Sequence, residues 1–113
     1  MFDLKNNATC KRLRNLLDDE VRVYIGSSIM TVHEVHTFQN WGKNTWMLKI
    51  VALCQSKGVS NFIKRYIKQL FGLNCSYIDE SRHGMLKYKT LVYDKVNKDN
   101  LSAIDVLCRM KGY

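Results

Sequence analysis

The sequence has no proline and only six glycines among 113 residues, so the usual markers of turns and linkers are scarce. It lacks the run of about 18 uncharged apolar residues that a membrane-spanning helix needs, and its first residues lack the basic-then-apolar pattern of a signal peptide. Its four cysteines are dispersed, without the paired spacing of a zinc site or the density of a disulfide framework. We therefore expect an intracellular, cytoplasmic protein that makes no membrane contact and keeps its cysteines as free thiols.

Two catalytic patterns are also missing. No G-x-x-x-x-G-K loop is present to hold the phosphates of a nucleotide, which argues against an ATPase or a kinase. No glycine-rich elbow surrounds a serine or cysteine, so a nucleophilic hydrolase is not indicated either.

The charge is strongly one-sided. Eighteen Lys and Arg against ten Asp and Glu leave a formal net charge of +8, and the pI is near 9.5. Such an excess favours polyanionic partners, DNA or RNA first and a protein with an acidic surface second. The alternative is a charged surface that only keeps the protein soluble.

The apolar pattern predicts one small α+β domain over residues 1–113, because this length supports one core. The expected sheet is antiparallel, with helices on one face and the element order α-β-β-(β)-α-β-β-α. Helical spacing is expected over 8–20, 59–71 and 101–110, strands over 21–25, 29–38 and 46–54, and a hairpin over 75–93 that turns near 82–84.

Several residues are expected to begin or end the helices. Ser60 is the expected N-cap of the second helix and Gly72 its C-terminal stop, while Asp99 or Asn100 should cap the third. The first helix is expected to end at the acidic run 18–20, where three carboxylates would oppose the helix dipole. That unfavourable placement suggests a functional role for the run; the alternative, which is the more common case, is a helix end that is simply solvated.

The hairpin carries the clearest basic face. Its return strand puts Lys87 and Lys89 on one side, with Arg82 near the tip, which makes these residues candidates for phosphate contacts. The expected solvent-exposed face of the helix over 59–71 is basic as well, although a charged helix face is most often simply solvated.

The segment Leu13-Arg14-Asn15-Leu16-Leu17-Asp18-Asp19-Glu20-Val21 resembles the motif of the LAGLIDADG homing endonucleases. The leucines match, Asp18 matches the first acid, and Glu20 stands in the place of the final acid. That family has a motif helix, a strand pair, a helix, a strand pair and a helix, with the sheet lying over DNA. Gln55-Ser56-Lys57 and Arg109-Met110-Lys111 are similar to its polar strand end and to the lysine after its last core helix.

The resemblance implies a DNA endonuclease that depends on Mg²⁺. Glu20 would bind the metal, Gln55 would position the attacking water, and Lys111 would stabilise charge on the phosphate. A chain with one motif would form a homodimer to cut both strands, although Arg14 and Asn15 replace the small residues through which the family's motif helices pack. DNA contacts would come from the sheet face, through Arg22, Tyr24, Lys49, Lys87 and Lys89.

The leading hypothesis is thus a basic nucleic-acid-binding protein, with a LAGLIDADG-like endonuclease as its catalytic form. The alternative is a non-catalytic binding module, such as a small repressor or a viral inhibitor of a host nucleic-acid or defence machine, that acts through protein contacts. A compact, basic chain of this kind suits a virus or a mobile element.

Overall fold

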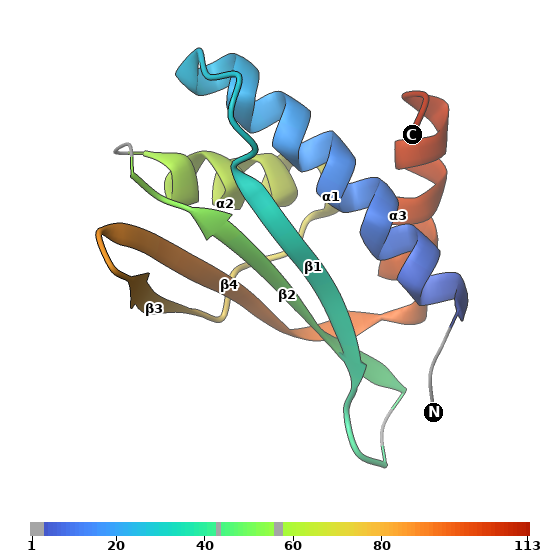
Figure 1. Ribbon diagram of the computed structural model, residues 1–113. Helices are drawn as coiled ribbons and strands as arrows, with labels where there is room; N and C mark the ends of the chain where they lie inside the picture. The colour runs from blue at the N-terminus through green and yellow to red at the C-terminus, as the bar shows by residue number, and fades with distance from the viewer. Residues whose placement is uncertain (1–3, 43, 56–57) are drawn as a thin grey trace.

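The computed structural model describes residues 4–42, 44–55 and 58–113. Within them, four strands form one antiparallel sheet in the order β1-β2-β4-β3, and three helices cover one face of it (Figure 1). No element among the described residues covers the other face, which we call the open face. The elements in chain order are α1 (Leu4–Ile25), β1 (Val32–Gln39), β2 (Thr45–Leu53), α2 (Val59–Phe71), β3 (Tyr77–His83), β4 (Leu86–Asn97) and α3 (Lys98–Met110).

This architecture confirms the predicted α+β class and the antiparallel sheet. The order is α-β-β-α-β-β-α, with one strand fewer before α2 than predicted, because residues 21–25 belong to α1. The strand predicted over 46–54 is β2, which pairs with β1 on one side and β4 on the other and is therefore central, as its two apolar faces suggested.

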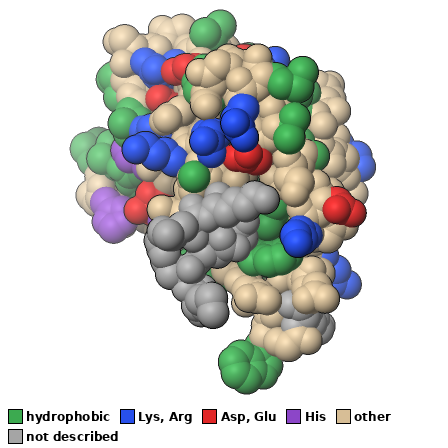
Figure 2. All heavy atoms as spheres, turned by 90° about the vertical axis from the view of Figure 1, so that its right-hand side faces the viewer, with side chains coloured by type: hydrophobic (Ala, Val, Ile, Leu, Met, Phe, Trp, Pro, Cys, Tyr) green, Lys and Arg blue, Asp and Glu red, His purple; other side chains and the backbone are tan. Residues whose placement is uncertain are grey.

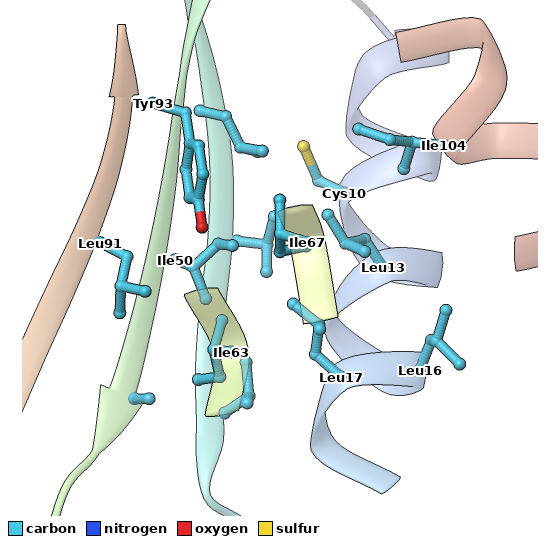
Figure 3. Close-up of a cluster of buried hydrophobic side chains, with 14 of the residues drawn as sticks. Cys10, Leu13, Leu16, Leu17, Ile50, Ile63, Ile67, Leu91, Tyr93 and Ile104 are labelled. Atoms are coloured by element: carbon cyan, nitrogen blue, oxygen red, sulfur yellow. The ribbon is translucent and has the colours of Figure 1, made fainter. Parts of the chain in front are cut away.

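The core lies between the sheet and the helices. Leu13, Leu17 and Val21 of α1 are buried at successive turns, because an i, i+4 spacing keeps them on one face. Figure 3 shows side chains of α1 facing Ile63 and Ile67 of α2 and the strand residues that complete the cluster. All four cysteines are free thiols, as predicted, with Cys10 and Cys108 buried and Cys54 and Cys75 half-buried.

The strand predicted over 21–25 is wrong, because these residues are the last turns of α1. The alternating pattern Val-Arg-Val-Tyr-Ile favours a strand locally, but burial of Val21 extends the apolar stripe of the helix. Arg22 then lies one turn from Asp18, with Nε 3.1 Å from Oδ2. Gly26, at φ 65°, ends the helix instead of the acidic run.

The predicted bounds of α2 are confirmed, but its predicted N-cap is wrong. Gly72 adopts the left-handed conformation and donates its N–H to the Lys68 carbonyl, so it ends the helix as predicted. The N-cap is Gly58, however, and Ser60 is buried inside the first turn. In α3 the N-cap is Asn97 and not Asp99 or Asn100, although Asn100 takes part in the reciprocal capping box as its N3 residue.

Candidate nucleic-acid interface

The acidic run 18–20 lies within α1 and its first carboxylate is used inside the fold. Asp18 is 5% exposed. Its Oδ1 accepts hydrogen bonds from the backbone N–H groups of Thr31, at 2.7 Å, and Val32, at 3.0 Å. These two bonds fix the chain at the entry to β1, so this carboxylate has a structural role.

The other two carboxylates face the C-terminal end of the described chain. Asp19 pairs with Arg22 at 2.8 Å and accepts a hydrogen bond from the Tyr113 hydroxyl. That hydrogen bond is the main reason why the pKa of Asp19 lies below its usual range, with Arg22 adding to the effect. It also raises the pKa of Tyr113 to about 12. Burial, followed by the charge of Glu20, raises the pKa of Tyr66 to about 12.

Glu20 is on α1, whereas Gln55 lies beside the β3–β4 hairpin. Its amide donates to the Met85 carbonyl at 3.3 Å and accepts from the Lys87 N–H at 2.9 Å, which ties the end of β2 to the β3–β4 hairpin. Lys111 is exposed at the C-terminal cap of α3. Ser56 and Lys57, the rest of the predicted polar segment, lie outside the described residues.

No cluster of metal-ligating side chains surrounds Glu20 among the described residues. Across the residues that the structure describes, no group of three or more His, Cys, Asp or Glu side chains is arranged to hold a metal ion. The predicted Mg²⁺ site at Glu20 stays a prediction.

The residues predicted to contact DNA from one sheet face lie on three different surfaces. The prediction that they share a face is therefore wrong. Arg22 and Tyr24 belong to α1 and not to a strand. Lys49 lies on the open face, 5.6 Å above the Phe38 ring. Lys87 and Lys89 alternate with Tyr88 as predicted, but they share the face of the buried residues Leu91 and Tyr93, so they point to the helix-bearing side of the sheet.

The two hairpin lysines are also partly neutralised. Glu80 on the neighbouring strand approaches Lys87 at 3.2 Å and Lys89 at 3.8 Å. The hydrogen bond from Lys87 is the main cause that holds the pKa of Glu80 below its usual range. Arg82 is exposed on the same face and lowers that pKa further. The hairpin therefore carries less free positive charge than its sequence indicates.

A different surface carries cations without carboxylate partners. Lys64, Arg65 and Lys68 are exposed on α2, and none has an ion pair with a described carboxylate. Asn61 shares their stripe, since positions 61, 64, 65 and 68 follow the i, i+3, i+4, i+7 spacing of one helix face. We call Asn61, Lys64, Arg65 and Lys68 the α2 basic face.

Shallow depressions adjoin the α2 basic face at both ends. The first is lined by Tyr24 and Gly58 together with Asn61, Lys64 and Arg65. The second is lined by Lys64, Arg65, Lys68, Gln69, Leu73, Asn74 and Cys75. Lys64 and Arg65 line both depressions, so cations of the α2 basic face border each of them.

The basic residues over α1 and α3 are arranged differently. Asp105 lies 3.0 Å from Arg12 and 3.8 Å from Arg109, and its Oδ1 also accepts a hydrogen bond from Thr9. Figure 2 views the molecule from the side of α3 and shows Lys and Arg side chains beside Asp or Glu side chains. Asp105 thus pairs with cations of both α1 and α3, whereas no described carboxylate pairs with the cations of the α2 basic face.

The distribution of acidic residues along the sequence could have indicated the α2 basic face. No Asp or Glu occurs between Glu34 and Asp79, whereas Lys64, Arg65 and Lys68 all fall in that interval. A long acid-free segment with clustered cations leaves few local partners for them.

Comparison of this chain with protein-family models and with curated proteins found no match. Among the described residues, no helix combines the length and the apolar character needed to cross a membrane. The function is therefore inferred from the site itself.

Proposed function

We propose that this protein binds nucleic acid and contacts the phosphate backbone through the α2 basic face. The observation that carries the proposal is the absence of carboxylate partners for Lys64, Arg65 and Lys68 among the described residues, in a chain with a net charge of +8. A cation held by a carboxylate must break that pair before it binds a phosphate. An unpaired cation keeps its full charge for the ligand, and its binding releases counterions from the nucleic acid.

Geometry supports the same surface. Lys64 and Lys68 are one turn apart, which corresponds to roughly 6 Å along the helix axis. The helix is anchored through the buried residues Val59, Ile63 and Ile67, so the cations stand on a rigid support. The adjoining depressions give a strand room to lie against them.

The test is a salt series of binding isotherms measured by fluorescence anisotropy with labelled DNA and RNA oligonucleotides. We expect wild-type affinity to fall steeply between about 50 and 200 mM salt. Replacement of Lys64, Arg65 and Lys68 by alanine should weaken binding. It should also reduce the slope of log K against log salt by about 2 on a single strand or about 3 on a duplex, since each lost phosphate contact removes about 0.7 or 0.9.

A matched variant controls for net charge. Lys11, Lys95 and Lys98 are exposed and lie outside the α2 basic face, so their replacement by alanine removes the same three charges elsewhere. Equal losses in the two triple variants would overturn the assignment of the interface. Wild-type protein that binds neither DNA nor RNA at low salt would overturn the proposal and favour an acidic protein partner.

A catalytic form of the proposal is a Mg²⁺-dependent DNA endonuclease. Its support is the element order, which is the order that the LAGLIDADG resemblance implies, and the position of Glu20 in the acidic run of α1. The test is whether Mg²⁺ adds nicking to binding.

A further inference from the structure

Three aromatic rings are stacked between α1 and α2. The Tyr24 and Phe62 centroids are 4.4 Å apart with an interplanar angle of 23°. The Phe62 and Tyr66 centroids are 6.0 Å apart with an angle of 26°. Phe62 and Tyr66 are half-buried and pack against the core, whereas Tyr24 is 49% exposed. The stack therefore begins at the core and ends at the surface with Tyr24.

The exposed end of the stack meets the α2 basic face. Tyr24 lines the same depression as Asn61, Lys64 and Arg65, and Gly58 forms another part of the wall. A Cβ atom at position 58 would lie 3.4 Å from the Tyr24 hydroxyl oxygen, so the tyrosine lies close against this turn. Phe62 supports one part of the ring, and the exposed remainder lies beside two cations that have no described carboxylate partner.

This combination suits an unpaired nucleotide better than a base pair. Proteins that bind single strands combine a positively charged track for the backbone with aromatic side chains on which bases stack. A base inside a duplex is already stacked on its neighbours, and a ring beside the phosphate track gains nothing from it. An unpaired base can turn onto the ring while its phosphates stay on Lys64 and Arg65.

We infer that the α2 basic face binds single-stranded nucleic acid and that Tyr24 is the platform on which one base stacks. The inference rests on the proposed function and adds the class of nucleic acid. DNA and RNA single strands share the chemistry that the site requires, so both are tested.

The experiment compares wild type with Tyr24→Phe and Tyr24→Leu on single-stranded DNA, single-stranded RNA, duplex DNA and heparin, which supplies charge without bases. Wild type should bind single strands more tightly than duplex at equal salt. Tyr24→Phe should keep this preference because the ring remains. Tyr24→Leu should lose about tenfold in affinity for single strands, since one base–aromatic stack accounts for about 1–3 kcal/mol, while its affinity for heparin should not change.

Tyr77→Leu is the matched control, because Tyr77 is similarly exposed, at 44%, and belongs to β3. It should leave all affinities unchanged. Circular dichroism spectra and thermal melting confirm that each variant is folded, and Tyr24→Leu keeps an apolar contact with Phe62.

The possible failures are distinguishable. If the α2 triple variant loses binding but Tyr24→Leu binds single strands like wild type, the proposed function stands and the stacking inference is refuted. Equal wild-type affinity for single strands and duplex would refute it as well. If wild type binds heparin but neither DNA nor RNA, both proposals fail and the surface serves another polyanion.

Discussion

Replacement of Asp18 by alanine should destabilise the protein severely, although this residue lies in the segment that resembles a catalytic motif. Its Oδ1 accepts from two buried backbone N–H groups, at 2.7 and 3.0 Å. A hydrogen bond to a charged partner contributes about 1.5–3 kcal/mol. Loss of both bonds leaves two buried donors without a partner, so we expect the free energy of unfolding to fall by about 3–5 kcal/mol. That is a large share of the roughly 5–15 kcal/mol typical of a domain.

Asp18→Asn should cost much less. An asparagine Oδ1 can still accept from Thr31 and Val32, but its NH₂ group would face the Arg22 guanidinium in place of Oδ2, which lies 3.1 Å from Nε. We expect a loss of about 1–2 kcal/mol from this variant. Asp19→Ala is the neighbouring control, because its side chain is 46% exposed and screened by water. It also removes the Tyr113 hydrogen bond, but it leaves no buried backbone donor without a partner, so it should cost clearly less than Asp18→Ala.

The assay is urea unfolding followed by far-UV circular dichroism, with the free energy of unfolding obtained by linear extrapolation. The predicted order of stability is wild type, Asp18→Asn and then Asp18→Ala. An alanine variant within about 0.5 kcal/mol of wild type would refute the structural role of Asp18. An asparagine variant as unstable as the alanine variant would show that the charge, and not the acceptor geometry, dominates.

Two further predictions concern the remaining carboxylates of the run. The hydrogen bond to Asp19 raises the pKa of Tyr113 from its ordinary value of 10.0 to about 12, so its stabilising effect is complete below pH 10 and lost as the pH rises toward 12. Wild type should therefore lose stability over that window relative to Tyr113→Phe, and a stability difference that stays constant across the window in urea titrations would contradict the linkage. In the endonuclease hypothesis, wild type should nick DNA with Mg²⁺ whereas Glu20→Gln should bind without nicking; equal cleavage by both proteins would remove Glu20 from the mechanism.

The sequence alone determined the elements whose signals are local. The helix predicted over 59–71 has those bounds in the structure, because its apolar spacing is regular and Gly72 supplies the left-handed residue that ends it. The hairpin and its turn near Gly84 were predictable for the same kind of reason, since strand alternation and a glycine turn are read over a few residues.

Tertiary contacts make residues 21–25 helical. Their alternating pattern fits a strand by propensity alone. In the folded chain Val21 is buried in the core, and Tyr24 stacks on Phe62, which belongs to α2. Partners more than one turn away cannot be inferred from the segment itself, so propensity was overridden.

Only the tertiary structure decided which cations are available to a ligand. Lys87 and Lys89 formed the best basic pattern in the sequence, yet Glu80 approaches both from the neighbouring strand. Lys64 and Arg65 looked like part of an ordinary wet face, yet no described carboxylate pairs with them and Tyr24 of α1 lies beside them. Net charge is a sum over the sequence, whereas free charge depends on which side chains the fold brings within a few ångströms of one another.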